Sequence, residues 1–130
     1  MQTVKPIIVL VDDSAAMRAF FEQVAAEADL AFHAYASAEA SLSFLASRQP
    51  SLLFLNVMMP SKDGYSFLKE LRRNELHATT RTVMISSKDY AQDRTAAKEL
   101  GVLEFVAKPI SKKAIRLLIE KYLGTGNGSP

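Results

Sequence analysis

The segment IIVLVDD, residues 7–13, joins a run of five apolar residues directly to two aspartates. Four of the five apolar residues are β-branched, and such an uninterrupted run is typical of a strand buried on both faces, as in parallel sheets. Ser14 follows as a candidate helix N-cap, and apolar residues then recur at helical spacing at Met17, Phe20, Phe21, Val24 and Ala28. The segment therefore predicts a buried strand that ends in acidic residues and leads into a helix.

The same alternation of short apolar runs with amphipathic stretches continues along the chain. It predicts further strands at 31–35, 52–55, 82–85 and 102–106, and helices at 38–46, after Gly64, at 91–100 up to Gly101, and around Ile115 to Tyr122. Parallel strands need crossover connections, which helices usually supply. Five strands alternating with five helices therefore predict an α/β protein with a parallel sheet and helices on both faces.

The composition fits a single globular domain of 130 residues, 48% hydrophobic and 23% charged. The absence of cysteine excludes disulfides and thiolate metal sites. A net charge of +2 without a long run of Lys or Arg predicts no direct nucleic-acid binding. No apolar segment has the length of a membrane span or a signal peptide, so a cytoplasmic location is expected. Residues 124–130, GTGNGSP, are typical of a flexible linker or tail.

Polar side chains follow four of the predicted strands. Asp12 and Asp13 end the first strand, Asn56 the third, Ser86 the fourth and Lys108 the fifth. Ligands of open parallel sheets bind beyond the carboxyl ends of the strands, so we expect these side chains to converge. Adjacent carboxylates above an apolar strand need compensating positive charge. A hard cation such as Mg²⁺ and the N-terminal end of the next helix are both candidates, and the residues alone leave the choice open.

Four segments of the chain resemble the successive motifs of bacterial response-regulator receiver domains. They are IIVLVDDSAAMR (7–18), LLFLNVMMPSKDGYSFLKELR (52–72), TVMISSKD (82–89) and VLEFVAKPI (102–110), within a resemblance that extends from Ile7 to Leu123. The resemblance implies a flavodoxin-like, doubly wound (βα)5 fold with strand order 2-1-3-4-5 and a receiver domain over residues 1–123. It also implies signalling from a sensor histidine kinase or phosphotransfer protein to a downstream protein or fused output domain.

The resemblance also implies a role for each strand-end residue. Asp12 and Asp13 match the acidic pair that holds Mg²⁺, and the backbone carbonyl of Met58 matches a further metal ligand. Ser86 and Lys108 match the residues that contact the phosphoryl group. Two further matches concern the switch and the loop: Phe105 corresponds to the aromatic residue that moves with the hydroxyl residue, and Pro60 and Gly64 shape the loop that completes the pocket.

Asn56 departs from the family pattern because the phosphoacceptor there is an aspartate. A carboxamide is uncharged and a very poor nucleophile, so we predict that the chain as written is not phosphorylated. The amide oxygen of Asn56 could still contact a metal, but the pocket loses one negative charge, and Mg²⁺ affinity should fall. Neither Asp63, expected in an Asp-Gly turn, nor Asp89 stands at a strand end to replace it. A natural pseudo-receiver and an engineered variant both fit the sequence.

Two other functions compete with signalling by phosphorylation. One is a constitutive protein-interaction or dimerisation module with a relic acidic pocket, for which a homodimer is compatible with the apolar content. The other is a phosphatase of the haloacid-dehalogenase type, which needs an aspartate nucleophile and usually a cap domain. This chain has neither, so we expect no enzymatic activity. His33 and His77 are expected to be surface or structural residues, and Tyr90 a half-buried aromatic.

Overall fold

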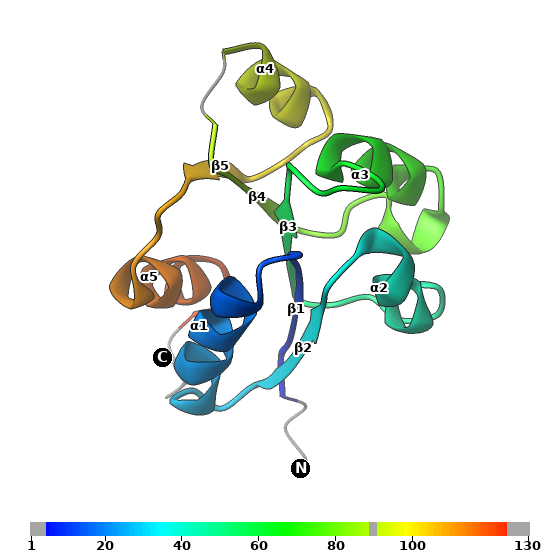
Figure 1. The fold of residues 1–130 in the computed structure, drawn as a ribbon. Coiled ribbons are helices and arrows are strands. Elements are labelled where there is room, and N and C mark those ends of the chain that lie inside the picture. Colours follow the sequence, from blue (N-terminus) through cyan, green and yellow to red (C-terminus); the bar gives the residue numbers. More distant parts are fainter. Residues whose placement is uncertain (1–4, 89–90, 125–130) are drawn as a thin grey trace.

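The computed structural model describes residues 5–88 and 91–124 of the chain. Its strands are β1 (Ile7–Val11), β2 (Ala31–Tyr35), β3 (Leu52–Asn56), β4 (Thr82–Ser86) and β5 (Glu104–Ala107). Its helices are α1 (Ala15–Ala26), α2 (Ala38–Leu45), α3 (Gly64–Arg72), the short 3₁₀ helix η1 (Glu75–His77), α4 (Ala91–Glu99) and α5 (Lys112–Leu123). The strands form one parallel sheet of order β2-β1-β3-β4-β5 (Figure 1), which confirms the predicted fold.

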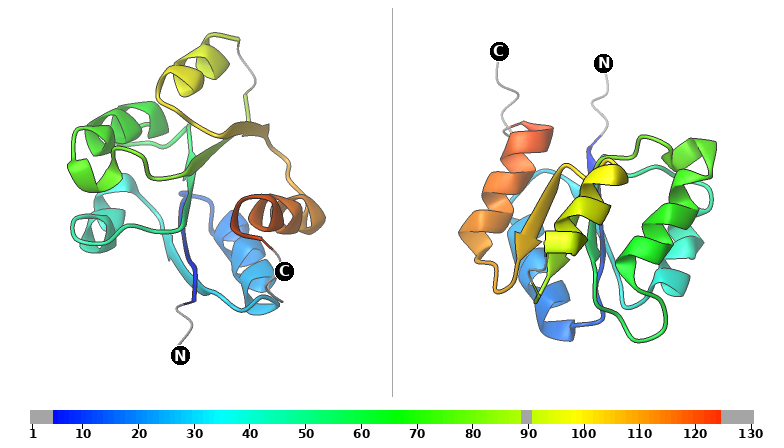
Figure 2. Two further views of the ribbon diagram at one scale, coloured as in Figure 1. Left: turned by 180° about the vertical axis from the view of Figure 1, so that it is seen from behind. Right: turned by 90° about the horizontal axis from the view of Figure 1, so that it is seen from above.

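The sheet lies between two helical layers, and alternate residues of each central strand face one layer or the other. Val9 and Val11 of β1 pack in the core with α2, α3 and Ala97 of α4, whereas Ile8 and Leu10 pack with α1 and α5. Figure 2 shows these two layers from behind and from above. Because both faces are covered, β1 and the first four positions of β3 need apolar residues, which explains their uninterrupted apolar runs.

Polar residues start four of the α-helices. The side chain of each N-cap residue accepts a hydrogen bond from a backbone N–H of the first helical turn, at Ser14, Ser37, Asp63 and Ser111. The Asp63 carboxylate accepts from the Ser66 N–H at 2.9 Å, so this residue is the N-cap of α3, and the predicted turn role was incomplete. The capping fixes the residues at which α1 and α3 begin, after the ends of β1 and β3.

The fifth strand differs from its prediction. It was expected at Val102–Val106, but β5 runs from Glu104 to Ala107. Gly101 has a φ of 76°, and Val102 packs against the core from the loop that follows it. The apolar character of Val102 therefore reflects core packing of a loop, whereas Leu103 is exposed. The short helix η1 was not predicted, and Asp89, Tyr90 and residues 125–130 lie outside the described part of the chain.

The strand register brings the predicted polar residues to one edge of the sheet. Val11 lies opposite Leu55, Asn56 opposite Ile85, and Ser86 opposite Ala107. The residues that end β1, β3, β4 and β5 therefore lie at the same level on neighbouring strands. Within residues 5–88 and 91–124, no helix has the length and apolar character to cross a membrane.

Candidate functional site

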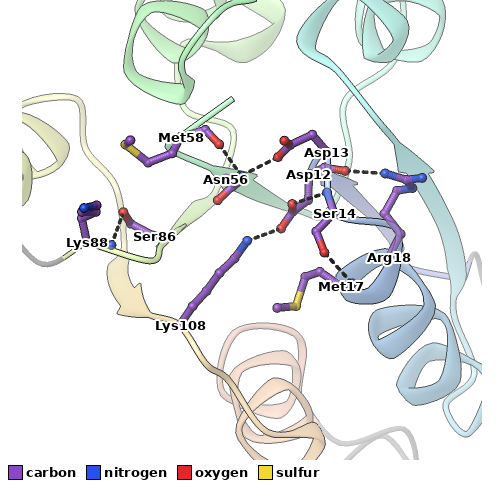
Figure 3. A network of polar contacts seen from close by, with 10 residues as sticks. All are labelled: Asp12, Asp13, Ser14, Met17, Arg18, Asn56, Met58, Ser86, Lys88 and Lys108. Carbon is purple, nitrogen blue, oxygen red and sulfur yellow. Dashed lines mark hydrogen bonds and ion pairs between the residues drawn. The ribbon is translucent and has the colours of Figure 1, made fainter. Parts of the chain in front are cut away.

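Asp12 is fully buried at the end of β1, and an ion pair compensates its charge. Its Oδ1 accepts a hydrogen bond from the Ser14 N–H at 2.9 Å, while Lys108 Nζ lies 3.0 Å from its Oδ2 (Figure 3). The lysine contact lacks hydrogen-bond geometry, so Oδ2 has no hydrogen-bond donor within the described part of the chain. Charge attraction therefore holds Lys108 over the end of β1.

Arg18 also contacts the first strand end, although the sequence did not single it out. Its Nη1 donates a hydrogen bond to the Asp12 carbonyl oxygen at 2.9 Å, and Ser14 Oγ accepts from the Met17 N–H at 3.2 Å. The signal was the position of Arg18, four residues after the N-cap and thus on the same side of α1 as the strand end. These contacts fix the backbone that carries both aspartates.

Asn56 is 3% exposed and joins the end of β1 to the loop that follows β3. Its side-chain Nδ2 donates to Asp13 Oδ1 at 3.0 Å and to the Met58 carbonyl oxygen at 2.8 Å (Figure 3). An ionised carboxylate and a backbone carbonyl can only accept hydrogen bonds, so the amide nitrogen and not its oxygen must face them. The predicted site residues Asp13, Asn56 and Met58 are thus in direct contact.

Ser86 and Lys108 are brought together through the backbone. Ser86 is fully buried, its Oγ accepts from the Lys88 N–H at 3.1 Å, and its carbonyl oxygen accepts from the Lys108 N–H at 2.7 Å. Phe105, the predicted switch residue, is half-buried on β5 and packs against the core that includes α2 and α3. The guanidinium carbon of Arg94 lies 5.0 Å from the centre of its ring.

Gly64 keeps α3 close to the end of β3. Its N–H donates to the Val57 carbonyl oxygen at 2.8 Å, and a Cβ atom at this position would lie 2.5 Å from the carbonyl oxygen of Asn56. No side chain fits such a distance without a backbone shift. Glycine is therefore required here by the close approach of two backbones, which supports the predicted role of this residue in shaping the loop.

The polar groups at this edge of the sheet contact one another directly. Within the described ranges, no group of three or more His, Cys, Asp or Glu side chains could hold a metal ion. A cation bound by carboxylate and carbonyl oxygens needs those oxygens turned toward one point. Here the amide nitrogen of Asn56 lies against two of them, on Asp13 and Met58. The arrangement provides cross-strand hydrogen bonds and one buried ion pair without any ligand.

The family model described as the response regulator receiver domain matches residues 8–120. The chain is a response regulator receiver domain. This receiver domain is 30% identical over 123 residues to the probable transcriptional regulator ycf27 of Porphyra purpurea, covering 95% of the domain and 49% of that protein. It is 29% identical over 118 residues to the regulatory protein AtoC of Escherichia coli, covering 89% of the domain and 25% of that protein. The chain spans about half the length of the ycf27 relatives it matches.

Solved structures show the same fold at lower sequence identity. The chemotaxis protein CheY4 of Vibrio cholerae superimposes on the receiver domain with a TM-score of 0.84 and 18% identity, covering 92% of this chain and 99% of that one. A CheY-like receiver domain from Methanospirillum hungatei gives a TM-score of 0.83 and 17% identity, covering 93% and 94%. Receiver domains are modules of two-component signalling and generally bind Mg²⁺ at an acidic pocket.

Proposed function

We propose that this receiver domain acts in a two-component phosphorelay but does not accept a phosphoryl group as written. The observation that carries the proposal is the position of Asn56, at the end of β3 between Asp13 and the Met58 carbonyl. Acceptance requires attack by a carboxylate oxygen on a phosphohistidine. The amide nitrogen of Asn56 has a delocalised lone pair, and it donates hydrogen bonds to both neighbours, so it cannot act as the nucleophile.

The remaining pocket residues retain the proposed family roles. Asp12, Asp13 and the Met58 carbonyl stand at the positions that would hold Mg²⁺ in the family, and an amide in place of a carboxylate at Asn56 opposes Mg²⁺ binding there. Ser86 and Lys108 would contact a phosphoryl group in a variant that carries an aspartate at position 56. The buried hydroxyl of Ser86 and the lysine held over the strand end support this assignment.

Output from the domain is proposed to be a two-state change in protein contacts. Ser86 and Phe105 would bias the surface formed by α4, β5 and α5, and a histidine kinase or phosphotransfer protein would be the partner upstream. In the absence of phosphorylation, protein binding itself biases the same equilibrium. We propose residues 1–123 as the domain, located in the cytoplasm, and residues 124–130 as a linker or tail. A downstream protein or a fused output domain would receive the signal.

Incubation with Mg²⁺ and acetyl phosphate tests the proposal. The protein as written and the Asn56→Asp variant are compared by intact-mass spectrometry. The variant should gain one acid-stable, base-labile phosphoryl group, and the protein as written should gain none. An acyl phosphate on the protein as written, at any carboxylate, would overturn the proposal.

A second substitution ties the chemistry to the pocket. Asp13→Asn in the Asn56→Asp background removes the proposed direct metal ligand and should abolish phosphorylation. Asp29→Asn in the same background is the matched control, because Asp29 is an exposed carboxylate that precedes β2 and pairs with Lys5. It should leave phosphorylation unchanged.

A constitutive interaction or dimerisation module is the second candidate. Leu103, in the loop before β5, is 39% exposed, and Leu117, on α5, is 53% exposed. Large exposed apolar side chains are candidate contacts for another protein. Sedimentation velocity of the protein as written and of Leu117→Glu distinguishes the candidates. A concentration-dependent dimer that this variant disrupts favours the module, whereas a monomer in both favours the switch.

A further inference from the structure

We infer that the amide group of Asn56 excludes divalent cations from the acidic pocket by occupying the place between Asp13 and Met58, and does not serve as a weakened metal ligand. The inference rests on the proposed function, because that proposal identifies the pocket as the family's Mg²⁺ site. It goes further because it holds that the amide nitrogen binds the same oxygens that a cation would bind. The two ideas predict opposite results for one variant, as derived below.

The first step is the hydrogen-bond geometry. The Asn56 Nδ2 carries two hydrogens and has two acceptors within range, at 3.0 Å and 2.8 Å. A cation bound to the same carboxylate and carbonyl oxygens would have to displace both hydrogen bonds. To act as a ligand, Asn56 would also have to turn its amide so that its oxygen replaced its nitrogen.

The second step is that Asn56 has little freedom to move aside. It is 3% exposed, and it pairs with Ile85 in the β3–β4 ladder. The backbone carbonyl oxygen of Asn56 lies so close to Gly64 that a Cβ atom on Gly64 would be 2.5 Å from it. The backbone of Asn56 is therefore fixed on both sides, and only rotation of the side chain could open the pocket.

The third step is charge. The negative charges that would attract a cation already have partners: Lys108 pairs with Asp12, and the amide of Asn56 donates to Asp13. Lys108 compensates the charge at Asp12 Oδ2 without the geometry of a hydrogen bond, so this oxygen has no hydrogen-bond donor within the described residues. The acidic pair thus retains cation affinity that the amide masks, and this affinity should reappear when the amide is removed.

A titration of three proteins with Mg²⁺, followed by the thermal midpoint Tm, separates exclusion from weak ligation. If the amide is a weak oxygen ligand, the affinity should fall in the order Asn56→Asp, Asn56 as written, Asn56→Ala. If the amide excludes the cation, Asn56→Ala should bind more tightly than the protein as written, although it offers one oxygen fewer. Mg²⁺ affinity should then fall in the order Asn56→Asp, Asn56→Ala, and last the protein with Asn56.

The expected result is a saturable rise in Tm for Asn56→Ala and Asn56→Asp, of about 5 °C when Mg²⁺ stands at ten times its Kd. The protein as written should show none over the same range. The inference is overturned if the protein as written responds at a lower Mg²⁺ concentration than Asn56→Ala. It is equally overturned if only Asn56→Asp responds. If Asn56→Asp does not respond either, the pocket is no metal site and the proposed function fails with it.

Two controls keep the result attached to the pocket. Asp13→Asn combined with Asn56→Ala should lose the Mg²⁺ response, whereas Asp29→Asn combined with Asn56→Ala should retain it. Circular dichroism in the presence of a chelator establishes that each variant is folded. Asn56→Ser, which also lacks the amide nitrogen, takes the place of Asn56→Ala if that variant does not fold, and it should show the same gain of response.

Discussion

At the scale of single residues, two neighbouring carboxylates are accommodated without a ligand by two different means. Asp12 is fully buried and depends on the charge of Lys108, which lies 3.0 Å away. Asp13 is exposed and accepts a hydrogen bond from the amide of Asn56. A buried carboxylate that loses its cation becomes an uncompensated charge in a poorly solvated site, whereas an exposed one is solvated by water. The two aspartates should therefore respond very differently to loss of their partners.

Lys108→Met tests this difference, because methionine keeps the apolar stem and removes the charge. Breaking a buried pair from one side costs about 3 kcal/mol of unfolding free energy, and we expect a loss of that order in urea denaturation. Lys113→Met, at an exposed position in α5, should change the value by less than about 0.5 kcal/mol.

A double variant completes this test. Asp12→Asn with Lys108→Met removes both charges and should recover much of the lost stability. If the single Lys108→Met variant were as stable as the protein as written, Asp12 would not depend on the lysine charge.

At the scale of elements, α4 is the helix with the weakest attachment to the sheet. Ala97 is its buried residue, so little apolar surface holds it. The Tyr65 hydroxyl of α3 donates a hydrogen bond to the Asp93 carbonyl oxygen at 2.7 Å. Burial, and then the nearby charges of Asp93 and Asp63, raise the pKa of Tyr65, so its hydroxyl keeps the proton that it donates.

Tyr65→Phe should therefore loosen α4 selectively. Loss of this hydrogen bond costs about 1 kcal/mol, and hydrogen exchange should accelerate at amides of α4 while those of α1 remain unchanged. Mass spectrometry of the exchanged peptides gives the measurement. Uniform acceleration across α1 and α4 would show global destabilisation instead and would contradict a local tie.

A polar cluster connects β5 to α5. Glu104 accepts hydrogen bonds from Lys121 at 2.7 Å and from the Tyr122 hydroxyl at 2.5 Å. The hydrogen bond from Lys121, followed by that from Tyr122, holds the pKa of the Glu104 carboxyl below its ordinary value. A lowered folded-state pKa stabilises the fold above the unfolded-state pKa of about 4.3, and the contribution disappears as pH falls through the folded-state value.

Glu104→Gln should consequently lower Tm at pH 7 and have a diminishing effect as the pH falls below about 4. The measurement is the difference in Tm between the two proteins across this pH range. Because the cluster is partly exposed, the effect should also shrink with added salt. A difference that is constant from neutral to acidic pH would show that the charge of Glu104 is irrelevant.

At the scale of the whole molecule, the sheet order places the ends of β1, β3 and β4 side by side, and β5 adds Lys108 at the outer position. Contacts at this edge therefore join strands that are distant in sequence. The amide of Asn56 links β3 to the residue that follows β1, and Lys108 links β5 to the same strand end. These two contacts therefore tie β3 and β5 to the same end of β1.

Much of this architecture could be predicted from the sequence, and the failures have physical reasons. The run at Ile7–Val11 identified a buried parallel strand because both its faces are covered, and the strand-end polar residues followed from it. The start of β5 was misplaced because Val102 is buried from a loop. The orientation of the Asn56 amide could not be predicted, since it depends on which acceptors the fold brings within reach.

The side-chain amide of Asn56 offers the most direct test of the central claim, that this amide closes the pocket of the receiver domain. Its two N–H resonances can be followed by NMR while Mg²⁺ is added, with Asn56→Asp confirming their assignment. We predict two distinct resonances that stay unchanged throughout the titration, because both hydrogens remain bonded to Asp13 and Met58. A saturable shift of these resonances at millimolar Mg²⁺ would contradict the account.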